Sequence, residues 1–158
     1  MSTPKPARKP AAARNQSAVA GPDRFAKVRA ARSSEVAEDY VEAIADQIAE
    51  HGTCRVADLA RHFGVSHVTV SRTVGRLVKS GLAETAPYKP VTLTAKGKRM
   101  AKASKSRHEI IVNFLRALGL DHRTAELDAE GLEHHVSPAT LRRFQDIVDG
   151  VYKLRPDP

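Results

Sequence analysis

The chain has 158 residues, of which 41% are hydrophobic and 28% charged, and its formal net charge is +8. This length and composition are typical of one or two small soluble domains that bury a real core. The single cysteine, Cys54, excludes a disulfide framework and a cysteine-rich metal site, and it fits a reducing cytoplasm. No apolar run reaches about 18 residues, so we expect no membrane-spanning segment and no membrane partner.

The charge is unevenly distributed along the chain. Residues 1–32 carry seven excess positive charges, residues 33–54 six excess negative charges, and residues 55–100 seven excess positive charges, while residues 101–158 are balanced. A basic block on a folded element indicates nucleic acid, because phosphate contacts dominate the affinity for it. Charge alone leaves open the alternative of a solvated basic surface.

The first 54 residues predict a tail and a long helix. Residues 1–22 are rich in Ala, Pro, Lys, Arg and Ser without an apolar period, so they are expected to be a disordered basic tail that either keeps the chain soluble or touches DNA. Asp23 can cap a helix that ends before Gly52. Its apolar residues recur on one helical face: Ala37, Tyr40, Val41, Ile44 and Ile48. By periodicity, Asp39, Glu42 and Asp46 fall on the opposite, solvated face.

Residues 55–81 predict a helix-turn-helix. A short amphipathic helix from Val56 to Phe63 is followed by Gly64, a suitable left-handed turn residue, and Ser66 can cap a second helix that ends at Gly81. The second helix carries polar groups opposite its apolar stripe, which can bond base edges or phosphates. The candidate DNA-contacting residues here are Ser66, His67, Thr69, Ser71, Arg72, Arg76 and Lys79.

Two short strands, residues 82–85 and 91–94, are predicted next, because a Pro-containing turn separates two β-type runs. A hairpin placed after a recognition helix is a wing, and Tyr88 and Lys89 at its tip are candidates for contacting the DNA backbone. The predicted architecture is therefore a winged helix-turn-helix. A winged helix used for protein contacts is the alternative.

An all-helical unit is predicted from residue 95 onward. Thr94 caps a helix that runs to about Leu118, Asp121 caps a short helix, and Ser137-Pro138 starts another. The apolar stripe of this last helix includes Phe144, Val148 and Tyr152. The unit is small, so we expect its apolar residues to be buried in a homodimer, which also suits two DNA half-sites.

A cluster of carboxylates and imidazoles lies on the predicted helix spanning residues 127–135. Glu130, Glu133 and His134 stand at i, i+3 and i+4, so they are expected on one helical face. Two carboxylates and an imidazole can chelate a divalent cation, and a solvated surface helix is the alternative. The run is neither H-E-x-x-H nor H-x-x-E-H, since Glu130 stands where the first His should be, which weakens a hydrolase interpretation.

Four segments together carry a family resemblance. VAEDYVEAIADQI, the winged helix-turn-helix, SRHEIIVNFLRALGL and DAEGLEHHVS resemble the manganese transport regulators, the manganese-sensing branch of the diphtheria-toxin-repressor family. The resemblance covers residues 23–150. It implies a mainly α chain with three parts: the tail 1–22, a DNA-binding domain 23–94, and a metal-binding and dimerisation domain 95–158. It also implies no extra C-terminal domain.

The resemblance implies a metal site with ligands from three helices, which would bind two Mn²⁺ ions per subunit. The implied ligands are Asp39, Glu42, His108, Glu130, Glu133 and His134. Four carboxylates and two imidazoles form a hard site that suits manganese, and Asp39 and Glu130 stand where iron-sensing relatives carry Met and Cys. The implied function is a cytoplasmic, manganese-responsive repressor that binds double-stranded operator DNA near manganese-uptake genes.

Three other interpretations remain. The first is an iron- or zinc-responsive repressor of the same family. The second is a winged-helix regulator that senses no metal. The third is a dinuclear metallohydrolase, but the sequence holds no recognisable nucleophile or general-base motif and no sign of a small organic substrate. We therefore expect no enzyme and no catalytic residue.

Overall fold

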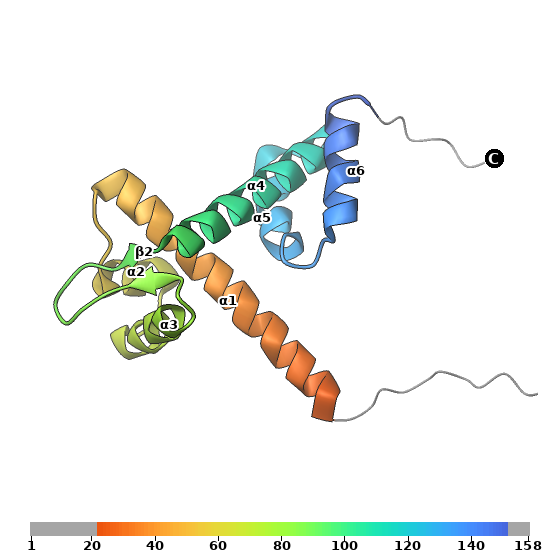
Figure 1. Cartoon of the computed structure of the whole chain (residues 1–158). Coiled ribbons are helices and arrows are strands. Elements are labelled where there is room, and N and C mark those ends of the chain that lie inside the picture. Colours follow the sequence, from red (N-terminus) through yellow and green to blue (C-terminus); the bar gives the residue numbers. More distant parts are fainter. Residues whose placement is uncertain (1–21, 152–158) are drawn as a thin grey trace, which may run out of the picture.

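The computed structural model describes residues 22–151, so the expected basic tail lies outside the described residues except for Pro22. Within this range the chain forms six helices and one two-stranded sheet, which confirms the predicted mainly α class. Two long helices, α1 (Pro22–His51) and α4 (Ala95–Ala117), meet where the first turns of α4 lie against the second half of α1, and α4 connects the small elements on one side to the helical unit on the other (Figure 1). None of these helices is long and apolar enough to cross a membrane.

Helix α1 (Pro22–His51) has two distinct halves. Its first turns project away from the rest of the chain (Figure 1), and the side chains described between residues 26 and 34 are exposed. Its second half buries Tyr40, Val41 and Ile44. Gly52 ends the helix with a φ of 74°, a left-handed conformation that glycine adopts without strain. The predicted apolar face is therefore confirmed.

The helix-turn-helix consists of α2 (Val56–Phe63) and α3 (His67–Lys79). Gly64 joins them in a left-handed conformation, and the Ser66 hydroxyl accepts the Thr69 N–H at 3.2 Å as the predicted cap of α3. Helix α3 buries Val70, Val74 and Leu77 against the core and leaves its opposite face exposed. The two predicted helices are thus present with the expected starts.

The predicted wing is present but its paired strands are shorter than expected. Strands β1 (Ala83–Glu84) and β2 (Thr92–Leu93) pair antiparallel, with Ala83 opposite Leu93 and Glu84 opposite Thr92. Pairing stops there because the N–H of Val91, which would face Thr85, bonds the carbonyl of Cys54 at 2.8 Å, and Tyr88 adopts a φ of 63° in the turn beyond it.

The first hydrophobic cluster unites α1, α2, α3, the wing and the start of α4. The rings of Tyr40 and Phe63 stack with their centroids 4.3 Å apart. Cys54 is a free thiol that is fully buried in this cluster, and burial raises its pKa to about 11. It therefore acts as a small apolar residue rather than as a metal ligand or nucleophile.

The second cluster unites α4 (Ala95–Ala117), α5 (His122–Leu132) and α6 (Pro138–Val148). The predicted caps of these helices are all present: Thr94, Asp121 and Ser137 each accept a backbone N–H. Phe114 and Phe144 stack at 3.8 Å between centroids and remain partly exposed. Tyr152, expected on the same stripe, lies outside the described residues.

Helix α4 therefore belongs to both clusters, and its first turn is fixed tightly to the winged helix-turn-helix. The Thr94 hydroxyl donates to the carbonyl of Gly81 at 2.7 Å. Gly97 is buried, and a Cβ atom built on it would lie 2.0 Å from the backbone oxygen of Leu82. Only glycine fits this approach, because a backbone carbonyl cannot move aside as a flexible side chain can.

We predict that Gly97→Ala destabilises the protein by at least about 2 kcal/mol, since the new methyl group must displace backbone. Gly75→Ala is the matched control. Gly75 lies in α3 with nothing within 4 Å of a built Cβ, so this variant should gain about 1 kcal/mol from helix propensity. Urea denaturation of both variants checks this, and equal stability of Gly97→Ala and the parent would contradict it.

Candidate metal centre

The candidate centre lies where three elements meet: α1, α4 and the turn after α5. The prediction that the helix continues through His135 is wrong, because α5 ends at Leu132 and Glu133 is its C-cap. The His135 N–H bonds the carbonyl of Leu132 at 2.9 Å, which forms a tight turn. Glu133 and His134 therefore come from this turn rather than from one regular helical face with Glu130.

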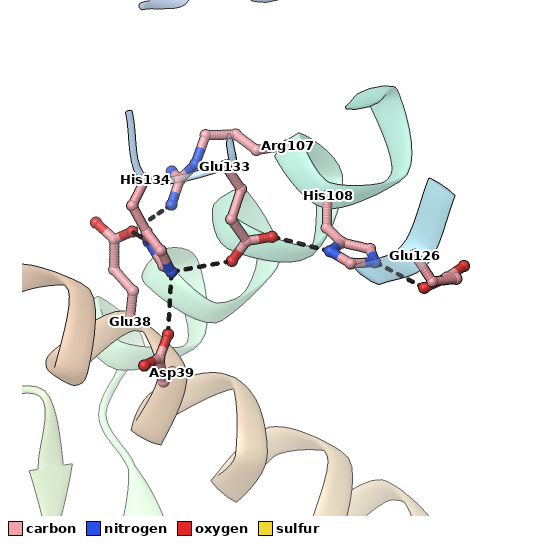
Figure 2. Close-up of polar contacts among 7 residues, drawn as sticks. All are labelled: Glu38, Asp39, Arg107, His108, Glu126, Glu133 and His134. Atoms are coloured by element: carbon pink, nitrogen blue, oxygen red, sulfur yellow. Dashed lines mark hydrogen bonds and ion pairs between the residues drawn. The ribbon is translucent and has the colours of Figure 1, made fainter. Parts of the chain in front are cut away.

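His134 connects this turn to α1 (Figure 2). Its Nε2 lies 3.1 Å from Oδ1 of Asp39 and 3.4 Å from Oε1 of Glu133, and its Nδ1 lies 3.1 Å from Oε2 of Glu38. The imidazole is 12% exposed, while the Asp39 side chain is 43% exposed. One imidazole thus contacts three carboxylates from two separate parts of the chain.

Glu133 connects the same turn to α4 through its other oxygen. Its Oε2 lies 2.9 Å from Nδ1 of His108, and Nε2 of His108 lies 2.9 Å from Oε2 of Glu126 (Figure 2). Glu133 is only 5% exposed, so it is a buried carboxylate between two imidazoles.

The surroundings of the cluster favour the protonated forms of its carboxyl groups and imidazoles. Burial raises the pKa of Asp39 and Glu133 above the ordinary carboxyl values, although the neighbouring imidazoles act against this rise. Burial opposes protonation of His108 and His134, but their carboxylate neighbours outweigh it, so the pKa of each imidazole is raised. A divalent cation could take the place of these protons, because it is also positively charged and binds the same oxygen and nitrogen atoms.

The donor set fits a hard divalent cation. Asp39, Glu133 and His134 offer ligand atoms that all lie within 4.8 Å of one another. A cavity of about 260 Å³ beside them is lined by Asp39, Glu42, Glu130 and Glu133, together with Asp46 and His62. Thus three predicted ligands form a compact group, Glu42 and Glu130 line the adjoining cavity, and His108 contacts the group through Glu133. Their ligation of metal stays a prediction.

Residues outside the predicted set also contact the cluster: Glu38, Arg107 and Glu126. The Arg107 guanidinium donates to Glu38, which ties α4 to α1. Glu126 stands four residues before Glu130 and seven before Glu133, a helical spacing that could have identified it. Glu38 had no such signal, because it contacts residues that are distant in sequence.

Most of the predicted DNA-contacting residues belong to α3 and its cap, and two lie in the turn of the wing. All nine are exposed: Ser66, His67, Thr69, Ser71, Arg72, Arg76, Lys79, Tyr88 and Lys89. A larger cavity of about 580 Å³ lies between them, lined in part by Ser71, Tyr88 and Lys89. This cavity shares no lining residue with the cavity beside the carboxylate cluster and is formed by α2, α3 and the wing. Whether the nine residues contact DNA stays a prediction.

Two family models match almost the whole described chain. The model described as iron dependent repressor, N-terminal DNA binding domain, matches residues 33–91, which hold the helix-turn-helix and most of the wing. The model described as iron dependent repressor, metal binding and dimerisation domain, matches residues 94–153, which hold His108, Glu133 and His134.

Curated relatives cover most of the chain. The transcriptional regulator MntR of Escherichia coli O6:H1 is 46% identical over 121 residues, which are 77% of this chain and 78% of that protein. The HTH-type transcriptional regulator MntR of Bacillus subtilis strain 168 is 38% identical over 111 residues, 70% of this chain and 78% of that protein.

Solved structures agree with these relatives. A manganese-dependent transcriptional repressor in complex with manganese matches with a TM-score of 0.63 and 32% identity over 72% of this chain. The manganese regulator SloR matches with a TM-score of 0.63 and 26% identity over 72% of this chain. This chain spans about half of those solved chains, 52% and 53% respectively.

We predict that the metal-free protein loses stability as pH rises above 6.5, the ordinary imidazole pKa. The folded pKa values of His108 and His134 are raised, so the folded state binds more protons than the unfolded state in this window. The contribution is complete below pH 6.5 and disappears as pH passes the raised values. Melting temperatures in chelator between pH 6 and 9 measure it, and His134→Gln should show a smaller decrease. A parent melting temperature that rises over this range would refute it.

Proposed function

The chain belongs to the iron-dependent repressor family, and we propose that it represses manganese-uptake genes when Mn²⁺ is bound. Members of this family are DNA-binding transcriptional regulators, so this chain is a transcriptional regulator and not an enzyme. One observation carries the choice of metal: the cluster at α1, α4 and the turn after α5 consists of carboxylates and imidazoles, with the only thiol buried elsewhere. Oxygen-rich sites of this kind suit manganese.

We assign the proposed ligands to a site that takes up to two ions per subunit. Asp39 and Glu42 come from α1, His108 from α4, and Glu130, Glu133 and His134 from α5 and its following turn. Bound Mn²⁺ would supply positive charge that these carboxylates otherwise obtain from protons and imidazoles. Shared carboxylates such as Glu133, which already contacts two imidazoles, are suited to holding two ions.

In this proposal, α1 connects the binding of metal to the binding of DNA. Asp39 is followed directly by Tyr40 and Val41, which are buried in the same cluster as α2 and α3. Holding Asp39 against Glu133 and His134 therefore restrains the position of α3 relative to the second cluster. In a homodimer this restraint sets the separation of two recognition helices on double-stranded operator DNA. Such coupling between two ligands is typically about 1–3 kcal/mol.

We propose that residues 23–94 form the DNA-binding domain and that residues 95–158 form the metal-binding and dimerisation domain. Since it would bind operator DNA, we propose that the protein acts in the cytoplasm.

An iron- or zinc-responsive repressor of the same family is the remaining alternative. Titration of a manganese-transporter promoter fragment with chelator, Mn²⁺, Fe²⁺ or Zn²⁺ at fixed salt distinguishes these cases. Equal binding in chelator and with Mn²⁺ would remove the metal switch from the proposal.

We predict that His134→Ala removes the Mn²⁺-dependent gain in operator affinity, about 1–3 kcal/mol, since it removes the imidazole that joins Glu38 and Asp39 of α1 to the turn after α5. Glu130→Ala, at an exposed position, should act in the same direction without disturbing the core. His51→Ala is the matched control, because His51 is an exposed imidazole at the end of α1, outside the site. Fluorescence anisotropy measures the affinities, and a full Mn²⁺ response in both site variants would exclude these ligands.

We predict that Arg72→Ala weakens operator binding by about 1–3 kcal/mol while Mn²⁺ affinity stays unchanged. Arg72 is exposed on α3, far in sequence from the proposed ligands. Arg142→Ala, which removes the same charge from α6, is the control and should bind as the parent does. Operator titrations and calorimetric Mn²⁺ titrations check the two halves of this prediction, and unchanged operator affinity would contradict it.

A further inference from the structure

Each imidazole of the candidate centre has one nitrogen directed at the cluster and the other at a carboxylate outside it (Figure 2). His134 directs Nε2 at Asp39 and Glu133, and Nδ1 at Glu38. His108 directs Nδ1 at Glu133, and Nε2 at Glu126. Neither Glu38 nor Glu126 is among the residues proposed to bind metal.

This geometry bears on which nitrogen binds metal. A neutral imidazole has one nitrogen with a proton and one without, and only the unprotonated nitrogen can coordinate a cation. A carboxylate that accepts a hydrogen bond from one nitrogen holds the proton there. It also fixes the plane of the ring and makes the free nitrogen more basic.

The two outer carboxylates are held to different degrees. Glu38 is 19% exposed, and it also accepts a hydrogen bond from the Arg107 guanidinium, itself only 25% exposed. Glu126 is 44% exposed, and its other oxygen lies 3.5 Å from Nδ1 of His122. Glu38 therefore has a charged, partly buried anchor from α4, whereas Glu126 has an exposed imidazole neighbour on its own helix.

We propose that Glu38 and Glu126 are positioning residues that select Nε2 of His134 and Nδ1 of His108 as the metal-binding nitrogens. Arg107 fixes Glu38 in place, so the effect of Glu38 is the larger of the two. The inference rests on the proposed function, because it requires that His134 and His108 bind a divalent cation. It adds two residues that act on the metal through an imidazole and do not touch it.

The chain offers a matched control for Glu38. Glu35 lies one turn earlier on α1, is 27% exposed, and stands 3.8 Å from Nδ1 of His135. It is thus another α1 carboxylate beside an imidazole of the same turn, but His135 is not a proposed ligand. Asp128→Asn is the corresponding control for Glu126, because Asp128 is an exposed carboxylate on the same helix.

The first test is a calorimetric Mn²⁺ titration of the variants. Glu38→Ala should lower Mn²⁺ affinity by about 10–100-fold, as removal of such outer carboxylates typically does, and Glu126→Ala by a smaller factor. Glu38→Gln keeps an oxygen that can accept from Nδ1–H, so it should recover part of the loss. Glu35→Ala and Asp128→Asn should bind as the parent does. Unchanged affinity in both Glu38→Ala and Glu126→Ala would overturn the proposal.

The second test identifies the nitrogens directly. Imidazole ¹⁵N spectra of the full chain loaded with Zn²⁺, a diamagnetic substitute, should show metal at Nε2 of His134 and Nδ1 of His108. Protons should remain on the other nitrogens, and Glu38→Ala should lose this preference at His134. Coordination through the opposite nitrogens in the parent would overturn the inference and leave the proposed function intact. Failure of the parent to bind Mn²⁺ would instead be the failure of the proposed function.

Discussion

Glu133 is a buried carboxylate, and within residues 22–151 the groups that face its two oxygens are the imidazoles of His108 and His134. An ionised carboxylate removed from water is costly unless cations or donors surround it. The imidazoles provide that positive charge only when they are protonated. The imidazoles also contact further carboxylates on α1 and α5, so the protonation of each group in the cluster depends on the charge of its neighbours.

This dependence connects regions that are otherwise separate. On α1, residues that contact the cluster stand next to residues of the core: Asp39 contacts His134, while the ring of Tyr40 stacks on Phe63 at the end of α2. A displacement of α1 by the charges at Asp39 is therefore also a displacement at the first helix of the helix-turn-helix. Consecutive residues of one helix thus contact both the carboxylate cluster and the hydrophobic core of the helix-turn-helix.

Much of the fold could be predicted because its local signals are strong. Ser66, Thr94, Asp121 and Ser137 each begin a helix as capping residues do, and Gly52 and Gly64 each adopt the left-handed conformation that ends a helix. The length of the wing strands and the end of α5 at Leu132 were less accessible. They depend on contacts between distant parts of the chain, namely the Val91 N–H with the Cys54 carbonyl and the turn after α5 with α1, which the local pattern does not contain.

The candidate site was only partly accessible in the same way. Periodicity placed Asp39 and Glu42 on a solvated face, and only the family resemblance marked them as ligands. Glu38 was missed altogether, because its partners, Arg107 and His134, stand 69 and 96 residues further along the chain. Pairing between distant elements leaves no period in the sequence.

The close approach of Gly97 to Leu82 has a mechanical consequence. It clamps the first turn of α4 to the DNA-binding unit, while the last turns of the same unbroken helix lie in the second cluster. If α4 were the only connection, the two units would be joined by a single helix. The contact of α1 with the turn after α5 is a second connection between the two units, and α1 runs at an angle to α4 (Figure 1). A rotation of one unit against the other about α4 therefore has to break the contacts that Glu38 and Asp39 of α1 make with His134.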